Sequence, residues 1–73
     1  MAGGDAMTPA EFKQARQSLG LTQAQAAAML GYGAANRISE IENGQRNAGA
    51  AVVQLLRAYL AGYRPDNWPP ELP

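Results

Sequence analysis

Residues 22–44 constrain the fold more than any other stretch, because they contain two short helix-forming segments separated by a glycine-containing turn. Thr22 and Gln25 have the spacing of a capping box, in which each side chain bonds the backbone N–H of the other residue at a helix start. Gly31 can end that helix in a left-handed conformation, which residues with a Cβ adopt only at a cost. The first segment is therefore predicted to be a short helix that ends near Gly31.

The second segment has an apolar side and a polar side. Ile38 and Ile41 are three residues apart and would both face a core, and Asn43-Gly44 is a stop signal after them. The opposite side carries Asn36, Arg37, Ser39 and Glu40. Two helices joined by a glycine-containing turn, the second with a polar outer face, predict a helix-turn-helix unit.

The segment from LGLTQAQAAAML through ISEIENGQR resembles the Cro/C1-type (XRE-like) DNA-binding domains of phage and bacterial repressors. The matching positions are Leu19, Gly20, Leu21, Thr22, Gln23, Ala27, Leu30, Gly31, Ile38, Ile41, Glu42 and Gly44. The match extends from about residue 8 to residue 61, most of the chain. The resemblance implies an all-α fold of four to five short helices, a lambda-repressor-like helix-turn-helix domain.

The turn between the two segments is one residue longer than is usual in this family. The family generally has two residues between the turn glycine and the second helix, whereas counting back from Ile38 gives one more within residues 31–34. The extra residue could loosen the turn or lengthen the start of the second helix. These alternatives shift the residues at that start by one position.

The chain is expected to form one small domain with an extension at each end. Residues 1–7 are predicted to be a disordered leader, residues 8–62 the helix-turn-helix domain, and residues 63–73 a proline-rich tail. Thr8 and Glu11 have the spacing of another capping box and predict a helix over residues 9–18. A last helix is expected to begin at residue 47 or 49 and to run to about residue 61.

This last helix has a wide apolar stripe made of two neighbouring rows. Val52, Leu55 and Tyr59 form one row, and Val53, Leu56 and Leu60 form the other. One row could face the core and the other a partner chain. Trp68 in the tail needs a surface to pack on, either in its own domain or across a dimer. The candidates for a dimer interface are Val52, Leu55, Tyr59 and Trp68.

Composition excludes several classes of chemistry. The 73 residues include no cysteine and no histidine, so disulfides and thiolate metal sites are ruled out and nucleophilic or metal chemistry would rest on scattered carboxylates. We therefore expect no enzyme activity, no metal and no cofactor. No run of eighteen apolar residues could span a membrane and no secretory signal is present, so a cytoplasmic location is expected.

The formal net charge of the chain is zero, although nucleic-acid binders are usually basic. Three of the acidic residues, Asp5, Asp66 and Glu71, lie in the two extensions. Between Thr8 and Arg64 there are six basic and three acidic residues, which leaves a positive surplus of three. The folded part therefore has a weak electrostatic footprint of the sign that DNA binding needs.

The polar face of the second helix contains the candidate base contacts. Such a face reaches base edges in the major groove, where Arg can pair with guanine, Asn with adenine, and Glu with the amino group of cytosine. An alanine at the helix start could touch a thymine methyl group. The proposed base contacts are Ala35, Asn36, Arg37, Ser39 and Glu40. The alternative is a helix face that is simply solvated.

The other candidate contacts are to DNA phosphates. The resemblance implies that Gln23 bonds a phosphate beside the N-terminal amides of its helix, and that the loop after the second helix contacts the DNA backbone. The proposed phosphate contacts are Thr22, Gln23, Tyr32, Asn43, Gln45 and Arg46. Tyr32 could instead be a packing residue. The resemblance also implies a structural ion pair between Arg16 and Glu42, with no contact to DNA.

These features predict sequence-specific binding of double-stranded DNA by a transcriptional repressor or autoregulator. One such domain contacts few bases, so a homodimer on an inverted repeat is expected. Small proteins that resemble this family often occur in phages, mobile elements and toxin–antitoxin operons, which suggests an antitoxin-like regulator with a protein partner as an alternative. A helical module that only binds proteins is a third hypothesis, supported by the near-neutral charge.

Overall fold

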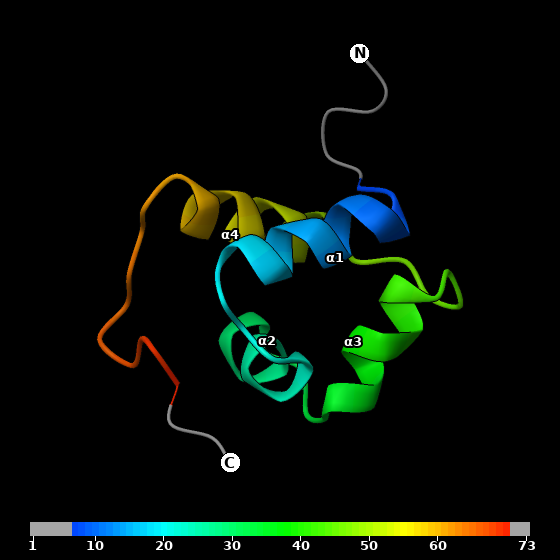
Figure 1. Ribbon diagram of the computed structural model, residues 1–73, viewed down its shortest axis with the longest axis horizontal. Helices are drawn as coiled ribbons and strands as arrows, with labels where there is room; N and C mark the ends of the chain where they lie inside the picture. Colours follow the sequence, from blue (N-terminus) through cyan, green and yellow to red (C-terminus); the bar gives the residue numbers. More distant parts are fainter. Residues whose placement is uncertain (1–6, 71–73) are drawn as a thin grey trace.

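The computed structural model describes residues 7–70, which form four short helices and contain no strand (Figure 1). The helices are α1 (Pro9–Ser18), α2 (Gln23–Leu30), α3 (Ala35–Glu42) and α4 (Ala50–Leu60). Helix α3 packs against α1 and α2, and α4 packs against the same two helices. The prediction of an all-α fold of four to five short helices is confirmed.

Two of the helices begin with the capping boxes that the sequence predicts. The Thr8 hydroxyl accepts the N–H of Glu11 at 3.1 Å, and the Glu11 carboxylate accepts the N–H of Thr8 at 2.8 Å. Thr22 and Gln25 exchange the equivalent pair of bonds at 3.1 and 2.9 Å. Each box satisfies backbone donors that have no partner inside the helix, so the starts of α1 and α2 are fixed by local sequence.

A glycine with positive φ follows the last turn of every helix in residues 7–70. At the end of α3, Gly44 has a φ of 80° and donates its N–H to Ile41, while the next N–H, of Gln45, bonds the carbonyl of Glu40. This is the Schellman pattern, in which two bonds return to the last free carbonyls. The chain therefore reverses sharply and lies back over the end of α3.

The core is made almost wholly of aliphatic and aromatic side chains from all four helices. Phe12, Ile38, Leu56 and Val53 are the largest of its fully buried members. The other buried hydrophobic residues are Ala15, Leu21, Ala26, Ala27, Met29, Leu30, Ile41 and Tyr59. Two of these residues, Ala26 and Ala27, are small side chains on α2.

Helix α4 does not use its two apolar rows as separate surfaces. Val53, Leu56 and Tyr59 are buried, whereas Leu60 is exposed and Val52 and Leu55 are half-buried against the core. The expectation that Tyr59 belongs to a dimer interface is therefore corrected. Its ring lies inside the domain, and its hydroxyl donates to the carbonyl of Met29 at 2.7 Å, one of the last carbonyls of α2.

The tail returns along the side of the domain toward α2 (Figure 1). The Trp68 ring lies 5.1 Å from the ring of Tyr59, centroid to centroid, and the Arg64 guanidinium lies 4.5 Å from the Trp68 centroid. The Gln25 amide donates to the carbonyl of Pro70 at 3.1 Å. The partly buried Trp68 side chain thus packs on its own domain, one of the two surfaces expected for it.

The expected disordered leader lies outside the described residues, except for its last residue. Met7 is half-buried and packs against the core next to α1. The last three residues of the expected tail, residues 71–73, also lie outside the described part.

Candidate nucleic-acid interface

The linker between α2 and α3 contains four residues, 31–34, and it accommodates the extra residue of this chain. Gly31 has a φ of 83° and donates its N–H to the carbonyl of Ala27, which also accepts the N–H of Tyr32 at 2.9 Å. Helix α3 begins at Ala35, three residues before Ile38, so three residues separate Gly31 from the helix. Of the two alternatives, the longer turn is therefore the one adopted, and it places Ala35 at the first position of α3.

The end of α3 is tied to α1 by two hydrogen bonds between Arg16 and Glu42. Arg16 Nε donates to Glu42 Oε2 at 2.6 Å, and Nη2 donates to Oε1 at 3.1 Å. Arg16 Nη1 also donates to the Leu21 carbonyl at 2.9 Å, which fixes the turn before α2. The two side chains that the resemblance pairs thus form a two-bond contact, the arrangement that suits guanidinium and carboxylate groups best.

Gln23 joins this network from the first position of α2. Its amide nitrogen donates to Glu42 Oε1 at 3.2 Å. Burial opposes ionisation of Glu42, whose side chain is only 4% exposed, but the hydrogen bonds from Arg16 and Gln23 outweigh that effect. The pKa of the Glu42 carboxyl is therefore lowered from its ordinary value of 4.5. This carboxylate holds the start of α2 beside the end of α3.

The outer face of α3 places the expected base contacts together. Asn36 and Arg37 are exposed, and Ala35, Ser39 and Glu40 are half-buried along the same helix. The Ser39 hydroxyl accepts a hydrogen bond from the Asn43 amide at 3.4 Å. The two isoleucines of α3 point the other way, into the core, so the helix presents a polar face that is anchored from behind.

Glu40 has two partners on this face, Arg37 at the i,i+3 spacing of a helical ion pair and Arg46, which sequence spacing does not indicate. Its Oε1 accepts from Arg46 Nε at 2.9 Å and lies 3.5 Å from Arg37 Nη1. The hydrogen bond from Arg46 lowers the pKa of the Glu40 carboxyl, and the charges of both arginines act in the same direction. For the contact with Arg46, the available sequence signal is the Asn43-Gly44 stop, which returns the chain toward α3.

The remaining expected phosphate contacts occupy the edges of this face. Thr22 caps α2, and a hydroxyl that accepts one hydrogen bond can still donate another. Gln45 and Asn43 are exposed in the reversed loop after α3. Tyr32, in the longer turn, is half-buried and packs against the core, which is the second of the two roles expected for it.

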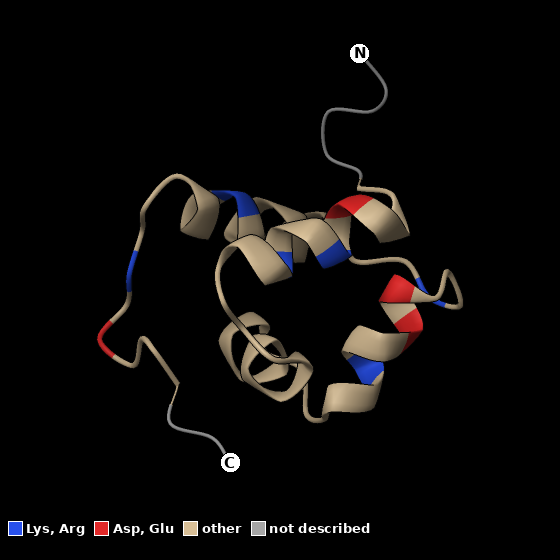
Figure 2. Ribbon diagram, in the orientation of Figure 1, with Lys and Arg blue, Asp and Glu red and all other residues tan. Residues whose placement is uncertain are grey.

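The charged residues are distributed unevenly along the chain (Figure 2). Helix α2 carries no charged residue, whereas α3 and the loop after it carry Arg37, Glu40, Glu42 and Arg46. Two of these charges are neutralised internally, since Glu42 pairs with Arg16 and Glu40 bridges two arginines. On this face of the domain, most of the positive charge is therefore paired with carboxylates.

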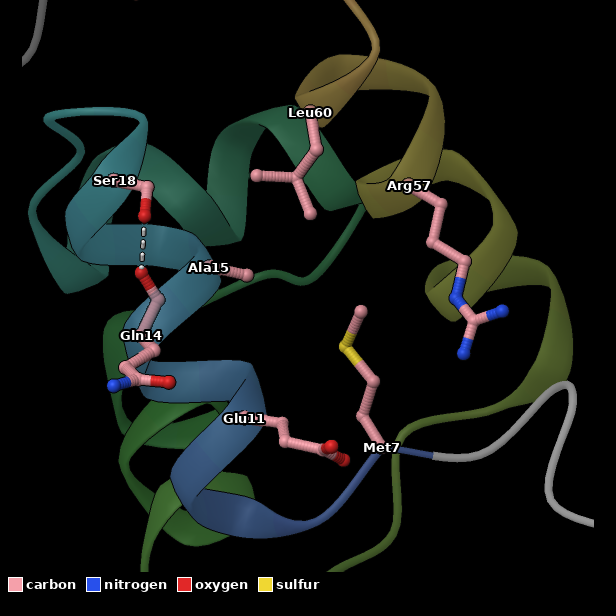
Figure 3. Close-up of a pocket in the computed structure, with 7 residues that line it drawn as sticks. All are labelled: Met7, Glu11, Gln14, Ala15, Ser18, Arg57 and Leu60. Atoms are coloured by element: carbon pink, nitrogen blue, oxygen red, sulfur yellow. Dashed lines mark hydrogen bonds between the residues drawn. The ribbon is translucent and has the colours of Figure 1, made fainter.

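A second surface feature, not anticipated from the sequence, lies between α1 and α4 (Figure 3). This groove has a volume of about 520 Å³ and is lined by Met7, Glu11, Gln14, Ala15, Ser18, Arg57 and Leu60. Its polar groups bond locally: the Ser18 hydroxyl donates to the Gln14 carbonyl, and Glu11 belongs to the first capping box. Nothing in this lining resembles a catalytic arrangement.

Residues 7–70 contain neither a candidate metal site nor a candidate membrane-spanning helix. No group of three or more acidic, histidine or cysteine side chains in that range is placed to hold a metal ion. None of the helices there has the length and apolar character needed to cross a bilayer.

Comparison with known proteins agrees with this geometry. The family model described as Helix-turn-helix matches residues 12–66, well over half of the chain, and so spans the buried ion pair, the turn and the polar face of α3. No curated protein and no solved structure matches the chain. Members of this family are DNA-binding regulators of transcription. The chain therefore belongs to the Cro/C1-type helix-turn-helix family of DNA-binding proteins.

Proposed function

We propose that this protein is a transcriptional repressor, or an autoregulator of its own promoter, that binds an inverted repeat as a homodimer. The observation that carries the proposal is the polar face of α3, which two buried isoleucines anchor while Asn36 and Arg37 remain exposed. An α-helix of this kind fits the major groove of B-form DNA. We place the protein in the cytoplasm, where such a regulator meets its promoter.

The proposed base contacts lie along α3. Arg37 can bond guanine at two positions and Asn36 can do the same with adenine, while Ala35 can contact a thymine methyl group. Ser39 lies one turn further along the helix. Glu40 belongs to the same face, but its carboxylate is already held by two arginines.

The proposed phosphate contacts come from both ends of the helix-turn-helix. Gln23 and Thr22 stand at the start of α2, where free backbone N–H groups favour an anion. Asn43, Gln45 and Arg46 follow α3 in the loop that Gly44 reverses, and Tyr32 is a further candidate through its hydroxyl. Contacts of this class fix the register of the protein on DNA and carry little sequence information.

A homodimer is proposed because one domain of this size contacts few base pairs. In a symmetric dimer the two α3 helices would contact half-sites about one helical turn, roughly 34 Å, apart. Val52, Leu55 and Trp68 stay as candidates for the interface, and Leu60 and Tyr63 are the exposed large apolar side chains within residues 7–70. Sedimentation that finds only monomer, both free and on DNA, would contradict this part of the proposal.

The experiment that tests the function is selection of duplex DNA from a random library by the purified protein at moderate salt. An inverted-repeat consensus is the expected result, and it would also give the spacing of the half-sites. The double variant Arg37→Ala/Arg46→Ala should lose both affinity and part of its salt dependence, because each phosphate contact contributes to the salt slope. No enrichment, with binding that disappears as salt rises, would reject the proposal.

A protein partner is the second candidate function, and the groove between α1 and α4 is the observation that favours it. Leu60 borders this groove and is 44% exposed. An antitoxin-like regulator would use this surface for its partner and α3 for DNA. A module that only binds proteins would keep its partner in the Arg37→Ala/Arg46→Ala variant and would select no DNA.

A further inference from the structure

Two arginines converge on one carboxylate at the proposed DNA-binding face. Glu40 Oε1 lies 2.9 Å from Arg46 Nε and 3.5 Å from Arg37 Nη1. All three side chains are partly exposed, Glu40 at 30%, Arg37 at 46% and Arg46 at 44%. The cluster is therefore accessible to DNA, and its bonds can exchange for bonds to DNA without unfolding the domain.

The two arginines reach Glu40 from different parts of the chain. Arg37 precedes it by one turn of α3, whereas Arg46 arrives from the loop that Gly44 reverses. One carboxylate thus connects the arginine proposed to contact bases with the arginine proposed to contact phosphate. Glu40 is ionised at neutral pH, as a carboxyl with the ordinary pKa of 4.5 is, and the hydrogen bond from Arg46 lowers that pKa further, so the negative charge stays at this surface.

We propose that Glu40 is a specificity-determining residue that acts by positioning Arg37 and Arg46. This inference rests on the proposed function. The carboxylate holds both guanidinium groups in the free protein and repels the phosphates of any duplex that approaches. Arg37 and Arg46 give up this partner only for DNA contacts of equal or better geometry, and those are made on the cognate sequence. Specific recognition commonly combines such a repulsive element with the attractive ones.

This positioning role of Glu40 differs from a direct contact between Glu40 and a base. A carboxylate that contacts cytosine must point at the base edge, whereas Glu40 Oε1 is directed to two guanidinium groups. If Glu40 contacted a base directly, its substitution would change discrimination at a single base pair. If Glu40 positions the two arginines, its substitution would change discrimination at every position that Arg37 and Arg46 contact.

The test compares Glu40→Gln with wild type on two DNAs, the duplex recovered by selection and a duplex of random sequence, at several salt concentrations. Glu40→Gln is expected to bind random DNA about three- to tenfold more tightly, because a negative charge is removed and two arginines are released. Its salt slope should steepen by about 1 to 2, which corresponds to one or two added phosphate contacts. The ratio of specific to random affinity should fall several-fold.

Glu11→Gln is the matched control. It removes the same charge from the groove between α1 and α4, and a glutamine can keep the capping box with Thr8. This variant should leave the ratio of affinities unchanged. If it lowers the ratio as much as Glu40→Gln does, net charge alone is the cause and the positioning role is wrong.

Other outcomes separate this inference from the proposed function. If wild type selects a duplex but Glu40→Gln leaves the ratio of affinities unchanged, the regulator stands and the positioning role is rejected. Loss of affinity confined to one C·G pair would make Glu40 a direct base contact and reject positioning. If wild type selects nothing, the proposed function fails, and NMR still tests the cluster: the Arg46 Nε–H signal should shift in Glu40→Gln, and an unshifted signal would mean that Glu40 does not hold Arg46 in solution.

Discussion

The Arg16–Glu42 pair shows how a single buried carboxylate can organise a small domain. Glu42 is 4% exposed on its side chain, and its charge is balanced by two bonds from Arg16 and one from Gln23. A buried ion pair adds little stability compared with apolar residues of the same shape, but removing one partner leaves an uncompensated charge. The pair therefore acts mainly as a constraint on the position of α3 relative to α1 and α2.

Removal of one partner from this pair should lower the free energy of unfolding far more than removal of both partners. We expect Arg16→Met to lower the free energy of unfolding by about 3–5 kcal/mol, because Glu42 is left buried without its cation. The double variant Arg16→Met/Glu42→Met should recover most of this loss. Urea denaturation of wild type, both single variants and the double variant gives the coupling energy directly. Additive losses in the double variant would show that the two side chains do not interact.

The same carboxylate predicts an acid-sensitive fold. The folded protein keeps Glu42 ionised to lower pH than the unfolded chain does, since its pKa is lowered from 4.5, so the unfolded chain binds more protons in acid. The contribution to stability is complete above about pH 5 and is lost as the pH falls through the lowered pKa. Wild type should therefore lose more unfolding free energy between about pH 5 and pH 3 than Arg16→Met/Glu42→Met does. An equal loss in both proteins would assign the acid sensitivity to other carboxylates.

Side-chain partners were the least predictable part of the site. The Arg16–Glu42 pair was expected only because the chain resembles a family, since 26 residues separate the two and no periodicity connects them. The contact between Glu40 and Arg46 was not expected, because Arg46 reaches Glu40 only after the chain reverses at Gly44. Periodicity identifies which residues share a face, but it does not say which of them bond each other.

At the scale of secondary structure, the four helices differ in whether a side chain caps their N-terminus. Helices α1 and α2 start with complete capping boxes, and local sequence was sufficient to predict where they begin. Helix α3 starts after Ala34, which has extended backbone angles and no side-chain hydrogen bond to the helix. Its start could not be predicted because the turn has an extra residue and no capping side chain marks the boundary.

The missing cap at α3 gives a prediction for a stabilising change. Ala34→Ser should raise the free energy of unfolding by about 1 kcal/mol, because a serine hydroxyl can accept an N–H of the first turn of the helix. Gly49→Ser, at the uncapped start of α4, is the matched control and should gain only a few tenths of a kcal/mol, since glycine is already a tolerable cap. Thermal and urea unfolding of both variants measure these changes in the free energy of unfolding. Equal gains, or no gain at Ala34, would mean that the start of α3 is not limited by capping.

Helix α4 shows why periodicity could not separate core from surface. Its two apolar rows lie side by side, so the direction facing the core could lie along either row or between them. In the structure Val53 and Leu56 of one row are buried together with Tyr59 of the other. Tyr59 turns inward because its hydroxyl bonds α2 and the ring of Trp68 lies against its own ring. The first contact comes from a helix 30 residues away in sequence, and the second from the tail that follows α4.

At the scale of the whole molecule, the described part of the tail, residues 63–70, packs against the helices. Trp68 contacts Tyr59 and Arg64, and Pro70 accepts a hydrogen bond from Gln25 at the start of α2. Proline content predicted that this segment would not be helical, but composition cannot show where an extended segment docks. The tail therefore buries apolar surface at the end of α4, which matters because a chain of this size has a small core.

Docking of the tail predicts that it unfolds together with the helices. Trp68 is the single tryptophan of the chain, so its fluorescence reports on the tail while far-ultraviolet circular dichroism reports on the helices. The two signals should give the same midpoint in urea, as expected for a two-state transition.

Trp68→Ala should lower the free energy of unfolding by about 1–3 kcal/mol, because aromatic contact and burial are lost. Asn67→Ala, a substitution of an exposed residue in the same segment, should change the free energy of unfolding by no more than about 0.5 kcal/mol. A fluorescence transition at lower urea than the helical one would mean that the tail detaches first, and Tyr59 would then be left partly uncovered in the folded domain.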